Sequence, residues 1–192
     1  MARAMILGMS GASRRADMFV DYEDDPREGG PSLGDERATL AEFLRCQRLT
    51  LELKCSGLDA EAMARRSVEP STMSLLGLVR HMAEVERDWF RRTMAGQDVP
   101  SLYRSAAEPD GDFDGAVPDP KVVAEAWETW RVECAFADRF VAEAIDLDIT
   151  GNYFDQAEVS LRELLVHMIE EYGRHNGHAD FLRERIDGRI GQ

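Results

Sequence analysis

Four long stretches of the sequence carry apolar residues at steps of three and four, the spacing of one buried face of an α-helix. The stretches cover residues 35–56, 71–95, 119–145 and 160–187. No alternation of apolar and polar residues of comparable length, which would indicate a strand, lies between them. Helices with one apolar face bury it against each other, so we expect an all-α fold, a four-helix bundle with strand content near zero.

Residues that cap helices mark the ends of these stretches. Asp35 indicates the start of the first helix, and Ser71 or Ser74 indicates the start of the second. Asp119 followed by Pro120 indicates the start of the third, and the capping box of Ser160 and Glu163 indicates the start of the fourth. Helix stops are indicated by Gly57, Gly96 and Gly188. Between the stretches we expect a short helical turn at residues 58–61, a long loop at residues 99–118 and a polar loop through Gly151 and Asn152.

Residues 1–33 lack helical periodicity. They contain the acidic run Asp21-Tyr22-Glu23-Asp24-Asp25-Pro26, followed by Gly29-Gly30-Pro31. Acidic runs with glycine and proline are typical of a loop or a loosely attached arm, and Phe19, Val20 and Tyr22 are the candidate anchors of this arm. The sequence therefore predicts a partly irregular N-terminal arm over residues 1–33 and one helical domain over residues 34–192.

The charge balance argues against nucleic-acid and membrane partners. The 37 acidic and 23 basic residues give a formal net charge of −14. Such a field repels a phosphate backbone and an anionic membrane surface. No stretch approaches the roughly 18 consecutive apolar residues of a membrane span. We expect a protein that binds neither nucleic acid nor membrane.

The cysteines and the start of the chain suggest a cytoplasmic protein. Cys46, Cys55 and Cys134 show no Cys-x-x-Cys spacing and are expected to be reduced thiols. The apolar patch Met5-Ile6-Leu7 is shorter than the core of a signal peptide, which needs about 7–15 apolar residues.

Three polar residues interrupt the apolar stripe of the last stretch. That stripe consists of Leu164, Met168, Glu171, His175, His178 and Leu182. A carboxylate in an apolar core is costly unless it is paired, protonated or bound to a metal. Glu171 and His175 are four residues apart and therefore share a helix face, as two ligands of one metal ion must.

His81 is the third candidate ligand, because it lies on the apolar stripe of the second stretch, between Leu78 and Val85. Helix bundles build metal sites from such facing side chains. Two histidines and one carboxylate suit zinc best, with nickel or iron(II) as alternatives, and leave coordination positions open. A hydrogen-bonded core histidine and a solvated Glu171 are the alternatives without a metal.

Two further histidines flank these candidates. His167 and His178 lie on the same predicted helix as Glu171 and His175. Each is expected to line the cavity or to support a ligand, and His178 is also the candidate catalytic residue, as a general base.

At this point the sequence shows a family resemblance. Residues 73–90 (MSLLGLVRHMAEVERDWF) and 167–180 (HMIEEYGRHNGHAD) resemble the DinB/YfiT-like superfamily, and within it the actinobacterial mini-circle-protein-like branch. The resemblance runs from about residue 34 to residue 188. It implies an up-down-down-up four-helix bundle, often a homodimer, with a metal ion at one end of the core.

The resemblance also carries a ligand pattern. The superfamily's usual set is a histidine on the second helix and His-x-x-x-His on the last, whereas this chain has Glu171 at the first position of that pair. Mycothiol-dependent maleylpyruvate isomerase is similar in using two histidines and one glutamate. The resemblance therefore implies His81, Glu171 and His175 as metal ligands, together with a small-molecule substrate and a thiol cofactor of low molecular weight.

Two hypotheses for function follow. The first is a divalent-metal-dependent enzyme, a mycothiol-type thiol S-transferase or a related hydrolase. The second is a non-catalytic helical binding or stress-response protein with a structural or vestigial metal site.

Overall fold

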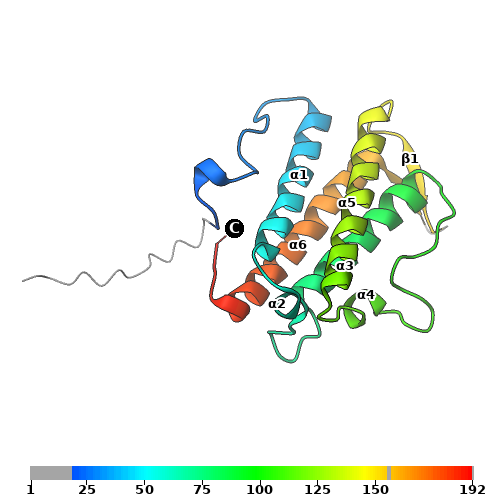
Figure 1. The fold of residues 1–192 in the computed structure, drawn as a ribbon. Coiled ribbons are helices and arrows are strands. Elements are labelled where there is room, and N and C mark those ends of the chain that lie inside the picture. The colour runs from blue at the N-terminus through cyan, green and yellow to red at the C-terminus, as the bar shows by residue number, and fades with distance from the viewer. Residues whose placement is uncertain (1–18, 155–156, 192) are drawn as a thin grey trace, which may run out of the picture.

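The computed structural model describes residues 19–154 and 157–191 and is mostly helical, with one small sheet (Figure 1). The elements are η1 (Tyr22–Asp24), α1 (Glu36–Cys55), α2 (Ala60–Ala64), α3 (Leu75–Glu86), the π-helical segment η2 (Arg87–Met94), α4 (Gly111–Asp114), α5 (Pro120–Glu143), β1 (Thr150–Tyr153), β2 (Ala157–Ser160) and α6 (Leu161–Asp187). No helix of the described residues has both the length and the apolar character that crossing a membrane requires.

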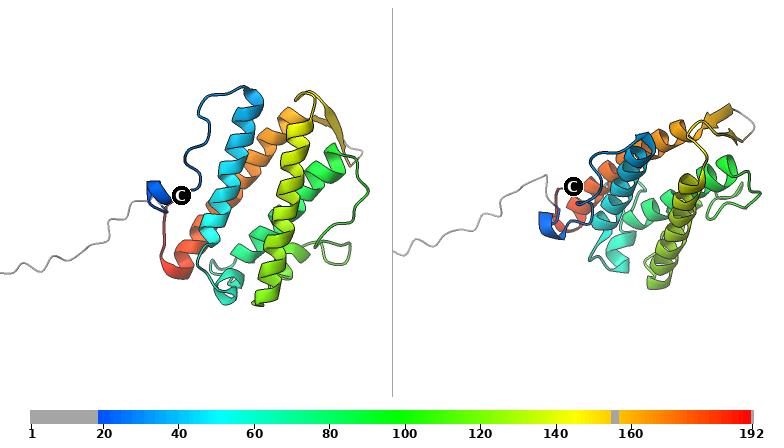
Figure 2. Two further views of the ribbon diagram at one scale, coloured as in Figure 1. Left: turned by 45° about the horizontal axis from the view of Figure 1, so that its top comes forward. Right: turned by 90° about the horizontal axis from the view of Figure 1, so that it is seen from above.

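The long helices pack in pairs. Helix α1 packs on α6, α3 packs on α5, and α3 also contacts α6. In Figures 1 and 2, α1 and α6 run in one direction while α3 and α5 run in the other. Because α3 and α5 are parallel, the chain between them must return along the length of α3.

Side chains at the predicted caps begin the long helices. Each cap side chain accepts a hydrogen bond from the backbone N–H group two or three residues later in the chain. The cap residues are Asp35, Ser74, Asp119 and Ser160. Ser74 and not Ser71 therefore begins α3. Helix α6 ends at Gly188, whose φ of 79° lies in the left-handed region that favours glycine. The expected short helical turn is α2, capped by Asp59.

The second helix changes its geometry before it ends. The sequence predicts one helix to Ala95, but the α-helical hydrogen bonds stop at Glu86 and the next eight residues are π-helical. The backbone N–H of Ala95 accordingly bonds to the carbonyl of Phe90, five residues back. π-Helical turns are rare and are often found near functional sites.

The expectation of near-zero strand content is wrong. Strands β1 and β2 form an antiparallel hairpin in which Thr150 pairs with Ser160 and Tyr153 with Ala157, where a polar loop was expected. The hairpin packs on η2, and the ring of Tyr153 stacks on Trp89 with 4.5 Å between centroids. A Cβ at Gly151 would lie 2.4 Å from the carbonyl oxygen of Thr93, so this close contact requires glycine.

The side chain of Phe19 is one anchor of the N-terminal segment. Phe19 is 4% exposed, and its ring contacts the cationic groups of Lys54, Arg183 and Arg189. Lys54 is itself buried, paired with Asp180, and burial lowers the pKa of its ammonium group. Residues 1–18 of the predicted arm lie outside the described residues, and the division into an arm and a domain stays a prediction.

A polar network crosses the apolar core. Arg48 of α1 donates two hydrogen bonds of 2.7 Å to the carboxylate of Glu86, which is fully buried. The same carboxylate accepts a 2.8 Å hydrogen bond from the hydroxyl of Tyr172 on α6, and that hydroxyl accepts one from the indole of Trp130 on α5. The thiol of Cys134 also contacts Glu86, and all three cysteines are free. The network therefore joins all four long helices.

Replacing Arg48 by methionine tests this network. The change leaves the buried charge of Glu86 without its cation, which typically costs about 3–5 kcal/mol. Urea denaturation followed by circular dichroism measures the loss. The control is Arg131→Met, since Arg131 forms an exposed ion pair with Glu52 that is worth at most about 1 kcal/mol. Equal losses in the two variants would contradict the importance of the buried pair.

Candidate metal centre

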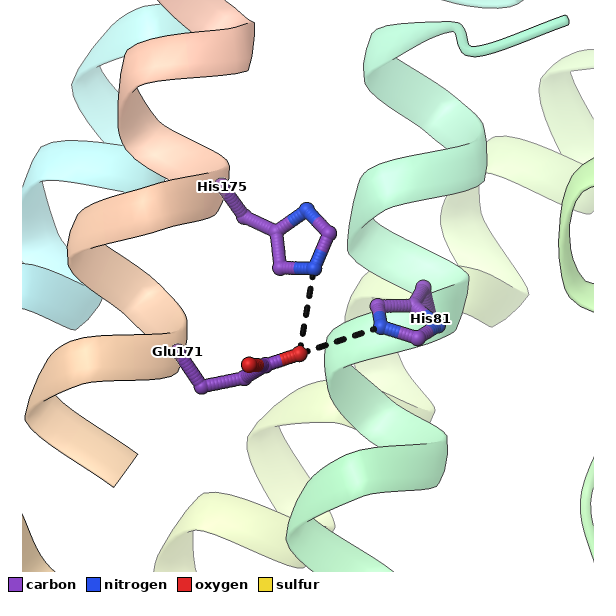
Figure 3. A group of neighbouring side chains, drawn as sticks. All are labelled: His81, Glu171 and His175. Carbon is purple, nitrogen blue, oxygen red and sulfur yellow. Dashed lines mark hydrogen bonds and ion pairs between the residues drawn. The ribbon is translucent and has the colours of Figure 1, made fainter. Parts of the chain in front are cut away.

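The three predicted ligands meet between α3 and α6 (Figure 3). Nε2 of His175 lies 3.2 Å from Oε1 of Glu171, and Nε2 of His81 lies 3.7 Å from the same oxygen. One ligand atom from each residue lies within 4.8 Å of the other two. The group can therefore offer two imidazole nitrogens and one carboxylate oxygen to a single cation.

Helical spacing and partial burial place these atoms. Glu171 and His175 are one turn apart on α6, and His81 faces them from α3. Their side chains are between 11% and 17% exposed, so the group is largely buried but open to solvent. The stripe predicted for α6 is otherwise as expected, because Leu164, Met168 and Leu182 are buried.

Each histidine is held from behind through its other ring nitrogen. Nδ1 of His81 lies 2.8 Å from Oδ2 of Asp112, and Nδ1 of His175 lies 3.3 Å from Nδ1 of His178. A carboxylate can only accept, so His81 donates from Nδ1, and Nε2 is the nitrogen that faces Glu171. Histidines that bind metals are commonly oriented by such a partner.

Asp112 is the site residue that sequence reasoning missed. It belongs to α4, a short helix within residues 99–118, where only a loop was expected. Arg80, which directly precedes His81 on α3, donates to the carbonyls of Gly111 and Asp112 and so holds this turn against α3. The length and acidity of the loop were the available signals, since long loops often carry function.

The surroundings favour the protonation states that bind a cation. Burial lowers the pKa of His175 to about 4, and the neighbouring His81 adds to this effect. Burial alone would raise the pKa of Glu171, but His175, Arg174 and His81 outweigh it and the pKa is lowered. At neutral pH the group therefore has a neutral imidazole at His175 beside an ionised carboxylate at Glu171.

The other neighbouring side chains do not come between the ligand atoms of His81, Glu171 and His175. Arg174 donates to Oε2 of Glu171 at 3.1 Å, which leaves Oε1 for the two imidazoles. The ring of Phe113 stacks on His81 with 5.2 Å between centroids. His167 lies one turn before Glu171 but packs against Trp89.

With this geometry in place, comparison with protein families decides the affiliation. The sequence model of the family described as Mycothiol-S-transferase matches residues 39–188, from the first turns of α1 to the end of α6. The chain belongs to the mycothiol S-transferase family. Mycothiol S-transferases are part of the DinB-like superfamily, so the resemblance of residues 73–90 and 167–180 to that superfamily is confirmed. Comparison with curated proteins and with solved structures gives no match.

For this mycothiol S-transferase family member, the lowered pKa of His175 predicts a pH effect on the metal-free protein. The folded pKa of about 4 lies below the ordinary value of 6.5, so the unfolded chain binds more protons between these pH values. Stability is therefore lost as the pH falls from about 6.5 toward 4. Between pH 7 and pH 5 the loss attributable to His175 is about 1–2 kcal/mol.

Urea denaturation with a chelator present, at pH 7 and at pH 5, measures this difference. The loss between the two pH values should be smaller in His175→Gln than in the wild type. His167→Gln is the matched control and should keep the wild-type difference. The same difference in His175→Gln and in the wild type would show that His175 does not cause the effect.

Proposed function

We propose that this protein is a metal-dependent thiol S-transferase that joins a low-molecular-weight thiol of the mycothiol type to a small electrophilic molecule. Membership of the mycothiol S-transferase family supports the thiol chemistry. The observation that carries the metal dependence is the meeting of His81 Nε2 and His175 Nε2 at one oxygen of Glu171. We propose these three residues as the ligands and zinc as the ion, with nickel or iron(II) as alternatives.

We further propose that α1, α3 with η2, α5 and α6 form the four-helix bundle of the DinB-like superfamily. The pairwise packing and the opposite directions of α1 and α6 relative to α3 and α5 support its up-down-down-up order. A homodimer and a cytoplasmic location remain expectations from the sequence.

The chemistry assigned to the site is activation of a thiol. When bound, a divalent ion supplies Lewis acidity, which makes a thiol more acidic at neutral pH. Asp112 keeps the hydrogen of His81 on Nδ1, and Arg174 holds the second oxygen of Glu171. Three protein ligands, partly exposed, leave room for the thiol and its electrophile.

We keep His178 as the candidate general base, with one condition set by its surroundings. Its Nδ1 lies against Nδ1 of His175, so one of the two nitrogens must donate and the other accept. If His175 donates, the hydrogen of neutral His178 is on Nε2 and only Nδ1 can take up a proton. His178 could then act as a base only if its contact with His175 opens.

Metal analysis of protein purified without a polyhistidine tag tests the proposal. We expect near-stoichiometric divalent metal and conjugation of mycothiol to a bimane electrophile. His81→Ala and His175→Ala should each lose the metal and the conjugation yet keep the helical circular dichroism spectrum, because the apolar core does not depend on them. His167→Ala is the control and should keep the metal. Absence of bound metal together with normal conjugation would overturn the metal dependence, and absence of both would favour a non-catalytic binding protein.

Two substitutions of Glu171 test the third ligand. Glu171→Leu should weaken zinc binding at least tenfold, because it removes a ligand, and the metal-free protein loses the contacts of Glu171 with Arg174 and His175. Glu171→His should keep zinc, since His-x-x-x-His has the same spacing. The site then gains one unit of positive charge, which should move the pH profile of activity downward. Zinc titration and thermal melting of both variants provide the measurements, and unchanged affinity in Glu171→Leu would exclude Glu171 as a ligand.

A further inference from the structure

Residues 97–116, here called the return segment, run back along α3 between η2 and α5. Side chains of α3 and η2 hold it at successive helical turns. Arg80 donates to the carbonyls of Gly111 and Asp112, and His81 contacts the Asp112 carboxylate. Glu84 accepts from the backbone N–H groups of Leu102 and Tyr103. Arg87 donates to the carbonyl of Pro100, and Asp88 pairs with Arg104. One helix edge therefore holds the segment near both of its ends, at residues 100–104 and at residues 111–112.

Glu84 makes the most deeply buried of these contacts. Its side chain is fully buried, and its carboxylate receives the backbone N–H of Leu102 at 3.0 Å from each oxygen and the N–H of Tyr103 at 2.8 Å. A buried carboxylate without donors is strongly disfavoured. Since these backbone groups supply the donors, Glu84 holds Leu102 and Tyr103 in one position.

The position of Tyr103 in turn constrains the position of Asp112. Its carbonyl oxygen lies so close to Gly111 that a Cβ there would approach it to 2.2 Å. The guanidinium of Arg80 lies 3.9 Å from the centre of the Tyr103 ring and donates to the carbonyls of Gly111 and Asp112. The start of α4 is therefore held between Tyr103 and Arg80, with the Asp112 carboxylate directed at Nδ1 of His81.

We propose that Glu84 is a positioning residue for the metal centre. It acts through Tyr103 and the start of α4 to keep Asp112 on His81, so that the hydrogen of His81 stays on Nδ1 and Nε2 faces Glu171 and His175. The effect on metal affinity rests on the proposed function, whereas the orientation of His81 is a property of the metal-free protein. The two parts can therefore fail separately.

The first measurement is the ring ¹⁵N spectrum of histidine in the metal-free protein. The chain has four histidines, so the spectrum of His81→Gln assigns the His81 signals. The wild type should show His81 with its hydrogen on Nδ1. In Glu84→Gln the amide places a donor against backbone donors, so the two His81 tautomers should interconvert. Arg183→Met is the control for general destabilisation, because Arg183 is buried and donates to the carbonyls of Lys54 and Ser56 outside the network of Glu86, and it should leave the His81 signals unchanged.

The second measurement is zinc affinity by competition with a chelating dye. Glu84→Gln and Asp112→Asn should each weaken binding about 10–100-fold, the usual effect of removing a partner that orients a metal-binding histidine. If Glu84 acts through Asp112, the double variant should bind zinc no more weakly than Asp112→Asn alone. Additive losses in the double variant would overturn the proposal.

A third variant covers the case in which Glu84→Gln does not fold. Gly111→Ala forces a Cβ against the carbonyl of Tyr103 and should change the His81 signals in the same way. An unchanged His81 spectrum in whichever of the two variants folds would refute the positioning role, even if wild-type zinc binding is normal. The two parts can also separate in the other direction. If the wild type binds no zinc, and the variants lose the single His81 tautomer that the wild type shows, the proposed function is refuted and the positioning role is supported.

Discussion

The carboxylate of Glu86 has no contact with water, and both of its oxygens are matched by the guanidinium of Arg48. A buried ion pair of this kind gains little over apolar packing, but either half alone is strongly destabilising. The position of α1 relative to α3 is therefore set by a contact that tolerates little displacement. Tyr172 and Trp130 extend the same contact to α6 and α5.

This network also bears on the metal centre, because Tyr172 directly follows Glu171. The hydrogen bond from Tyr172 to Glu86 fixes the rotation of α6 about its own axis. With that rotation set, Glu171 and His175 point toward α3 and not toward α1. The return segment sets the other half of the site, since Asp112 orients His81. Two independent sets of buried carboxylate contacts thus hold the two sides of one group of ligands.

Local chemistry explains what could be predicted from the sequence. A cap such as Ser160 acts on backbone groups within three residues, and the pair Glu171 and His175 needs only the helical repeat to share a face. His81 could be aligned with them because its neighbours show the same apolar spacing. The sequence therefore predicted the long helices and the residues of the candidate site.

Contacts between distant segments account for what was missed. Asp112 reaches His81 from 31 residues away, and nothing in its neighbourhood in the sequence marks that partner. The hairpin strands have four residues each, too few to show alternation, and depend on packing against η2. Over the eight residues of η2, apolar spacing does not distinguish a π-helical turn from an α-helical one. In the sequence, nothing distinguishes Glu86 from an exposed charged residue, because its partner Arg48 lies in another helix.

The burial of Lys54 under Phe19 has a practical consequence for the chemistry of the surface. The chain contains only two lysines, Lys54 and Lys121, and its other basic residues are arginines. Lys54 is 1% exposed, whereas Lys121 lies exposed in the first turn of α5. An amine-reactive dye or a solid support will therefore attach to one lysine side chain while Phe19 stays in place. Attachment at Lys54 would then report the release of Phe19 from its three cations.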